Sequence, residues 1–177
     1  MPILKIILDI CLLRGRAQDL PVSVSLVWIA AAASLTANSL GMLGQDAGLA
    51  PFLLIVSQIA LFGAAVWLVL RLRGFPARWL QAMTALYAVD TVSTLLLLPL
   101  LPALVEMLKQ GPEVVPGWEG YAMLALVGWL LLANARVLRE ATEWPLPLAF
   151  VTGLTLLLVV RMIGIFLVSL FGLVAPA

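Results

Sequence analysis

The stretch QAMTALYAVDTVSTLLLLPLLP (residues 81–102) places a carboxylate, Asp90, near the middle of a run that is otherwise apolar enough to cross a membrane. A second charge, Arg161, lies near the middle of the last apolar run, LAFVTGLTLLLVVRMIGIFLVSLFGLVA (148–175). On insertion scales such a charge costs about 2.5–3.5 kcal/mol at a helix centre, and each leucine offsets about 0.5 kcal/mol of that cost. Both runs can therefore insert, but we expect their charges to turn away from lipid.

The composition of the whole chain agrees with a membrane protein. Of its 177 residues, 64% are hydrophobic and 11% are charged, and the mean hydropathy is +1.16. A soluble domain has about 45–50% apolar and about 25% charged residues. The chain has too little polar surface to face water on all sides, which indicates a polytopic membrane protein. Its net charge of +1 comes from scattered residues, so no nucleic-acid partner is expected.

Five apolar runs are long enough for a helix of about 20 residues to cross the hydrocarbon core. They cover about residues 22–43, 51–70, 79–104, 120–138 and 148–174, and the loops between them are short. A membrane β-barrel would show alternating polar and apolar residues instead of solid apolar runs. We therefore predict an all-α membrane helix bundle with five transmembrane helices, which makes one transmembrane domain of residues 1–177.

The N-terminal segment MPILKIILDICLLRGRAQDL (1–20) differs from these runs, because Lys5 and Asp9 interrupt it. On a helical wheel Lys5, Asp9 and Arg16 fall within roughly 40° of one another. A helix with one narrow polar stripe should lie in the membrane interface or dock under the bundle. We predict such an amphipathic interfacial helix over residues 2–16. A cleaved signal peptide is the alternative, although Asp9 breaks its apolar core and no small-residue cleavage site follows.

The distribution of lysine and arginine predicts the orientation of the bundle. If the N-terminus is cytoplasmic and five helices span the membrane, only Lys109 lies on the outer side. Apart from Arg161, the other basic residues lie in the N-terminal segment or at the two inner loops and adjoining helix ends: Lys5, Arg14, Arg16, Arg71, Arg73, Arg78, Arg136 and Arg139. The predicted topology is N-in and C-out, in a membrane that the Ala/Leu-rich composition suggests is a bacterial inner membrane.

The neighbours of both intramembrane charges indicate inward-facing stripes. On the third span a polar stripe roughly 120° wide contains Thr84, Tyr87, Asp90, Thr91 and Thr94. On the fifth span Arg161 shares a stripe with small residues that allow close helix contact, namely Gly153, Gly164 and Gly172. Asp90 lies about 11 residues into its span and Arg161 about 13 into its own, so the two charges are at nearly the same depth.

This arrangement predicts a buried Asp90–Arg161 pair, with Tyr87 and the threonine hydroxyls filling the remaining hydrogen-bond sites. Two interpretations of the pair stay open. In the structural one, the pair fixes which helix faces which. In the functional one, Asp90 binds a proton or cation, or Arg161 binds an anionic headgroup or substrate.

Other polar residues in the spans predict contacts between helices. Ser34 and Asn38 are four residues apart on the first span, and Gln58 lies near the centre of the second. Hydrogen bonds across helices are the commoner use of such side chains in membranes. The chain has no histidine and one cysteine, Cys11. This composition excludes His/Cys metal sites and histidine-based catalysis, and we predict no catalytic residues, no metal and no cofactor.

The lead-in DICLLRGRAQDLPVS (9–23), the five closely spaced runs and the short C-terminal tail together resemble the small bacterial relatives of the Yip1 family. The resemblance covers the hydrophobic plan of residues 1–177. It implies a membrane protein linked to trafficking or membrane organisation, with no catalytic residues to carry over.

Three functions follow as hypotheses. The first is a non-enzymatic integral membrane protein that acts by contact, as a subunit, adaptor or membrane organiser, with a membrane-protein partner or as a homo-oligomer in the lipid bilayer. The second is a small oligomeric transporter or channel subunit, with Asp90 as a proton or cation site and Arg161 as an anion or headgroup site. The third is a membrane-embedded lipid enzyme, for which the chain shows no catalytic signature.

Overall fold

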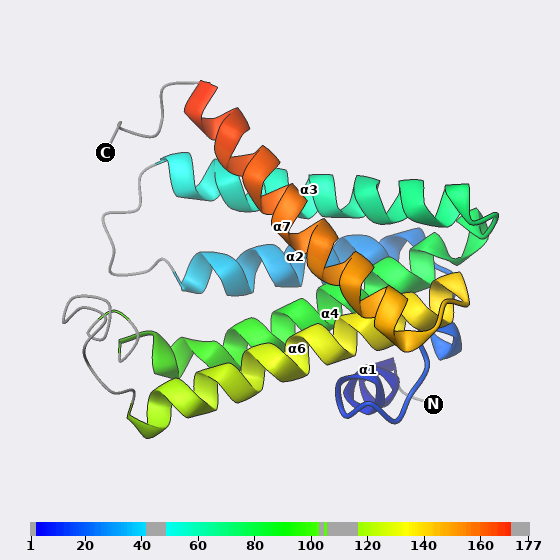
Figure 1. Cartoon of the computed structure of the whole chain (residues 1–177), viewed down its shortest axis with the longest axis horizontal. Coiled ribbons are helices and arrows are strands. Elements are labelled where there is room, and N and C mark those ends of the chain that lie inside the picture. The colour runs from blue at the N-terminus through cyan, green and yellow to red at the C-terminus, as the bar shows by residue number, and fades with distance from the viewer. Residues whose placement is uncertain (1–2, 42–48, 103–104, 106–116, 171–177) are drawn as a thin grey trace.

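The computed structural model describes residues 3–41, 49–102, 105 and 117–170, and every regular element within them is a helix (Figure 1). This confirms the predicted all-helical fold. The longer helices are α1 (Ile3–Cys11), α2 (Val24–Leu40), α3 (Leu49–Leu72), α4 (Trp79–Leu97), α6 (Trp118–Thr142) and α7 (Leu146–Leu170). Short 3-10 turns are η1 (Ala17–Asp19), η2 (Pro76–Arg78) and η3 (Leu98–Leu100).

Four of the described helical segments are long and apolar enough to cross a membrane: Leu49–Leu72, Pro76–Leu100, Trp118–Thr142 and Leu146–Leu170. They have 24 or 25 residues each, as expected for a multi-pass membrane protein. The run predicted at 22–43 forms the shorter α2, which has 17 residues. At 1.5 Å per residue α2 is about 25 Å long, less than the hydrocarbon core of about 30 Å. It begins after Ser23, whose hydroxyl accepts a hydrogen bond from the Leu26 N–H.

The five long helices form a closed ring, in the order α2, α4, α6, α7, α3 and back to α2. Neighbours in this order pack against each other, with α2 and α4 in the most extensive contact and α2 and α3 in the least. Figure 1 shows α7 crossing the other long helices obliquely. Every helix of the ring therefore has a face that looks toward a common interior.

Helix α4 is the most deeply buried element. All residues from Ala82 to Val89 are buried, so this segment has no lipid-facing side. Small residues such as Ala82 and Ala85 let α2 and α6 approach its backbone closely, while Met83 and Leu86 fill the space between the helices. This burial places the polar side chains of Thr84 and Tyr87 inside the bundle.

The N-terminal helix α1 is shorter than predicted: it ends at Cys11, whereas the expected helix covered residues 2–16. The chain turns at Leu13, which has a φ of 61°, and the carbonyl oxygen of Asp9 accepts hydrogen bonds from the N–H groups of Arg14 and Gly15. The turn brings η1 back against the bundle, so Arg16 does not belong to the same helix as Lys5. Figure 1 shows α1 at the end of the bundle where α4 begins.

Helix α1 packs on α4 through buried Ile10 and Cys11. Leu4 and Leu8 of α1, and Leu12 just after it, are exposed. Two hydrogen bonds from α6 also hold this segment in place. Trp129 Nε1 donates to the Cys11 carbonyl oxygen at 2.8 Å, and the Arg136 guanidinium donates to the Leu13 carbonyl oxygen. The segment is docked under the bundle, which is one of the two placements that its amphipathic pattern allows.

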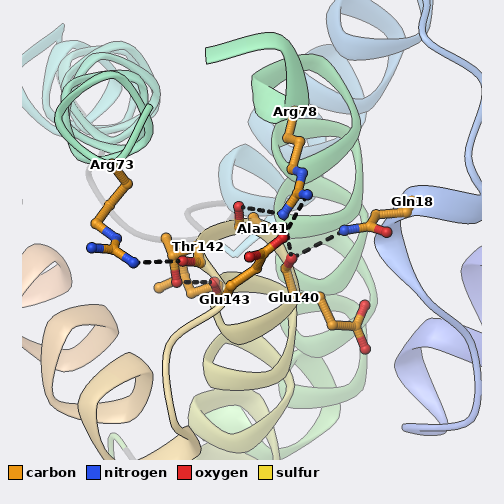
Figure 2. A network of polar contacts seen from close by, with 8 residues as sticks. Gln18, Arg73, Arg78, Glu140, Ala141, Thr142 and Glu143 are labelled. Atoms are coloured by element: carbon orange, nitrogen blue, oxygen red, sulfur yellow. Dashed lines mark hydrogen bonds and ion pairs between the residues drawn. The ribbon is translucent and has the colours of Figure 1, made fainter. Parts of the chain in front are cut away.

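A polar network surrounds the C-terminal end of α6 (Figure 2). Arg78 donates to the carbonyl oxygens of Glu140 and Ala141, both at 3.3 Å, and forms an ion pair of 2.7 Å with Glu143. Gln18 Nε2 donates to the Glu140 carbonyl oxygen at 3.0 Å. A guanidinium at this position satisfies carbonyl groups that the last helical turn leaves unpaired. The network joins η1, η2 and α6 at one end of the bundle.

Candidate functional site

The ring of helices contains a partly open cavity of about 320 Å³ that all five long helices line. Its walls are largely aliphatic and aromatic, but they carry polar side chains from every helix of the ring. These are Ser34 and Asn38 of α2, Gln58 of α3, Tyr87 and Asp90 of α4, Asn134 of α6 and Arg161 of α7. A cavity with few polar groups in apolar walls is the usual form of a small-molecule binding site.

Asp90 is held from α2. Its Oδ2 atom accepts a hydrogen bond of 2.6 Å from the Ser34 hydroxyl and one of 2.9 Å from the Asn38 amide. Asn38 also donates to the carbonyl oxygen of Ser34 at 2.9 Å, which orients its amide. Because Ser34 and Asn38 are one helical turn apart, both reach the same carboxylate oxygen. Ser34 and Asn38 therefore make the predicted hydrogen bonds between helices, and their partner is Asp90.

Arg161 lines the same cavity but does not contact Asp90. In the described part of the chain the ion pair within 4.0 Å is the one between Arg78 and Glu143. The predicted Asp90–Arg161 pair is therefore replaced by the α2 contacts of Asp90, and Arg161 is exposed. The cause is the rotation of α7, which buries Gly153, Val160 and Gly164 instead.

The hydroxyl groups of the α4 stripe make other contacts than those predicted. Tyr87 donates to the Ile59 carbonyl oxygen on α3 at 2.8 Å, and its hydroxyl lies close to Gly63. Thr91 donates to the Tyr87 carbonyl oxygen within its own helix. Neither Thr91 nor Thr94 lines the cavity, so of the predicted stripe only Tyr87 and Asp90 reach it.

Two amide side chains in the cavity have no hydrogen-bond partner among the residues that the structure describes. The Nε2 atom of Gln58 is buried and unpaired. Asn134 is only 6% exposed, and its side chain makes no hydrogen bond to the described residues. An unpaired polar group inside a membrane bundle costs free energy, which a bound water or ligand would recover.

Sequence reasoning did not include Asn134 in the site. The predicted fourth span ended at residue 138, and an amide next to Arg136 near a helix end is typical of the membrane interface. Helix α6 continues to Thr142, which places Asn134 about 12 Å from that end. The longer helix moves this amide to the depth of the cavity, and the residue pattern alone carries no signal for it.

The glycines predicted to allow helix packing lie at close contacts where the structure describes them. A Cβ atom on Gly153 would come within 3.1 Å of Leu138, and one on Gly164 within 3.2 Å of Leu54. Gly172 lies outside the described residues. These contacts position α7 against α6 and α3, and so set the wall of the cavity that carries Arg161.

The chemistry that the cavity offers is binding. It presents one carboxylate, one guanidinium, three amides and two hydroxyl groups, of which the Asp90 carboxylate is already oriented by hydrogen bonds. In the described residues no group of three or more His, Cys, Asp and Glu side chains is placed to hold a metal ion. The donors and acceptors suit a polar or charged small molecule.

Comparison of the chain with protein-family models, curated proteins and solved structures gives no match. The resemblance to the Yip1 family therefore stays a prediction, and functional inference depends on the cavity.

Proposed function

We propose that the chain spans a bacterial inner membrane five times with its N-terminus in the cytoplasm, and that α2 is the fifth span. Support comes from the basic side chains. Arg73, Arg78 and Arg136 all make hydrogen bonds at the end of the bundle where α1 docks. Basic residues concentrate on the cytoplasmic side of membrane proteins. A short α2 suits a helix whose ends lie under the headgroups of a locally thinned bilayer.

Within this topology we infer that the protein binds a small polar or charged molecule inside the membrane, as a subunit of a transporter or channel. Asp90 is the site for a proton or cation, and Arg161 is the site for an anion or headgroup. The observation that carries this proposal is one cavity, lined by all five long helices, that contains both charges unpaired with each other. Ionisable residues inside a membrane bundle are typical of substrate and ion pathways.

Cysteine labelling tests whether the cavity admits small charged molecules. In a Cys11→Ser background, Asn134→Cys places a thiol in the cavity wall, and Gly128→Cys places one on the same helix where nothing lies within 4 Å. We expect a small charged methanethiosulfonate to modify Asn134→Cys in membranes and to leave the lipid-facing Gly128→Cys unmodified. Equal, low reactivity at both positions would contradict the proposal.

A second candidate is the contact-mediated subunit or organiser that the sequence favours. The observation that supports it is the exposure of Arg161 among exposed apolar side chains of α7, such as Leu158 and Met162. An acidic side chain of a partner helix, or of a second copy, would compensate this charge. In that case Arg161→Gln lowers the oligomeric mass measured by light scattering in detergent, whereas ligand binding alone leaves the mass unchanged.

A further inference from the structure

The cavity holds two opposite charges, and each has hydrogen-bonding capacity to spare. Both hydrogen bonds to Asp90 from described side chains reach Oδ2, and none reaches Oδ1. Arg161 makes no hydrogen bond or ion pair to any described residue. The carboxylate is therefore oriented by α2 while its second oxygen stays available, and the guanidinium offers its full set of donors.

Charge balance decides which ligand fits such a site. A purely anionic ligand would compensate Arg161 and leave the Asp90 carboxylate without a counter-charge. A purely cationic ligand would do the reverse. In a membrane interior an uncompensated charge is costly, so a ligand that carries both charges compensates both residues at once.

We propose that the cavity binds a zwitterion, in which a primary ammonium group and a phosphate or carboxylate are joined by a short chain. The ammonium donates to Asp90 Oδ1, and the anionic oxygens accept from the Arg161 guanidinium, which suits bidentate recognition of such groups. Gln58 Nε2 and the Asn134 amide, both unpaired among the described residues, supply further hydrogen bonds. This inference rests on the proposed intramembrane binding and names its ligand class.

The size and opening of the cavity favour a lipid as the source of the zwitterion. Its volume of about 320 Å³ is within the range of small-molecule sites, roughly 300–1,000 Å³. Two of its lining residues, Leu158 and Arg161, are exposed on α7, so the cavity opens at that helix surface. A ligand from the bilayer reaches this opening directly. A free amino acid or phosphoethanolamine carries the same charges but would arrive from water.

Lipid retention by the purified full chain tests the proposal. The protein in detergent is incubated with equal amounts of phosphatidylethanolamine, phosphatidylcholine and phosphatidylglycerol, and bound lipid is counted by native mass spectrometry. We expect phosphatidylethanolamine to exceed both others by at least about tenfold, because choline lacks N–H donors and glycerol lacks the cation. Asp90→Asn and Arg161→Gln should each lower its retention about ten- to a hundredfold.

Matched variants outside the cavity control for charge alone. Asp9→Asn on α1 and Arg139→Gln on α6 should retain the lipid as the unmodified chain does. If Asp90→Asn fails to fold, Asn134→Leu tests the proposal instead, since this variant keeps both charges but removes an amide and fills the cavity. Its unchanged retention of phosphatidylethanolamine would overturn the proposal.

The remaining outcomes distinguish failure of the zwitterion proposal from failure of the proposed binding function. Free phosphoethanolamine that binds without retained lipid supports the same chemistry with a water-soluble ligand. Equal retention of phosphatidylethanolamine and phosphatidylglycerol overturns the zwitterion, and the proposed function survives if Asn134→Cys is reactive. If no lipid or phosphoethanolamine binds and Asn134→Cys is unreactive as well, both proposals fail.

Discussion

Asp90 is stabilised at one oxygen by Ser34 and Asn38, which are one turn apart on α2. Hydrogen bonds from neutral donors hold the carboxylate in the bundle without cancelling its charge. A salt bridge would have cancelled the charge and removed Asp90 from any role in binding. Because the partners of Asp90 are neutral, its carboxylate keeps a charge that can bind a ligand, whereas a carboxylate in a salt bridge would have only a structural role.

Asn38→Leu should destabilise the bundle, because it removes one of the two described donors to Asp90. Loss of a hydrogen bond to a buried charged group costs about 1.5–3 kcal/mol. Thermal unfolding in detergent measures the change. The control is Thr36→Val on the same helix, whose hydroxyl is exposed and donates only to the Ala32 carbonyl oxygen. Equal melting temperatures of the two variants would show that the Asn38–Asp90 bond contributes nothing to stability.

The candidate site could be predicted from the sequence only in part. Asp90, Arg161, Gln58, Asn38 and Tyr87 are recognisable because polar residues inside apolar runs are few, and all of them line the cavity. Their pairing could not be predicted, because it depends on the rotation of α7 about its own axis. A helical wheel groups Arg161 with Gly153 and Gly164. It does not show that the two glycines are buried while Arg161, at the edge of their stripe, is exposed.

Helices α3 and α4 make a close contact where Gly63 of α3 faces the side chains of Tyr87 and Trp79 of α4. The Trp79 indole donates to the Gly63 carbonyl oxygen at 2.9 Å, and a Cβ atom on Gly63 would lie only 2.9 Å from the Tyr87 hydroxyl. Tyr87 is 7% exposed and is bonded to Ile59, so its ring has little freedom to move aside.

Gly63→Ala should therefore destabilise the protein by about 1–3 kcal/mol through overpacking. Alanine is the better helix former, by about 1 kcal/mol, so Gly128→Ala on α6, where space is open, should be neutral or stabilising. Thermal unfolding of the two variants in one detergent compares them. A Gly63→Ala protein that melts as high as Gly128→Ala would contradict the close α3–α4 contact.

The docked position of α1 gives the chain an internal reporter, since its one cysteine, Cys11, is 3% exposed. Burial raises the pKa of the Cys11 thiol. The docked state thus favours the neutral thiol. The stability of the docked state is therefore greatest below the ordinary thiol pKa of about 8.5, and it falls as the pH rises above that value.

We expect slow reaction of Cys11 with a maleimide at pH 7 and a rate that rises at alkaline pH more steeply than for an exposed cysteine. Trp129→Phe removes the indole N–H that bonds to the Cys11 carbonyl oxygen and should accelerate labelling. Trp118→Phe, at an exposed tryptophan of the same helix, is the control. Labelling that is equally fast in the unmodified chain and in Trp129→Phe would show that α1 is not held as described.

For the molecule as a whole, the apolar runs predict the helices well, because a membrane helix needs length and hydropathy and both are local properties. The predicted runs at 51–70, 120–138 and 148–174 correspond to α3, α6 and α7 with ends that differ by up to four residues, and the run at 79–104 corresponds to α4 followed by η3. The end of α1 could not be predicted, because it is set by the turn at Leu13 and by contacts with α6. The order of helices around the ring also depends on contacts between distant segments.

The orientation proposed from the basic residues predicts where reporter fusions are active. An alkaline phosphatase fused after residue 47 or 112 should be active, because the proposed orientation assigns both positions to the periplasmic side, and one fused after Gly74 or Glu143 should be inactive. A fluorescent protein that folds only in the cytoplasm should show the reverse pattern. Activity of the phosphatase after Gly74 would contradict the N-in topology.

The most direct measurement compares the single variants Asp90→Arg and Arg161→Asp with the chain that carries both exchanges. Because Asp90 is held by two donors and does not contact Arg161, we predict that the double exchange is no better than Asp90→Arg alone in folded yield and melting temperature. Arg at position 90 would then face two hydrogen-bond donors and be left uncompensated. Recovery of yield and melting temperature in the double exchange would show that the two charges form a structural pair, and would contradict a cavity with two charges available to a ligand.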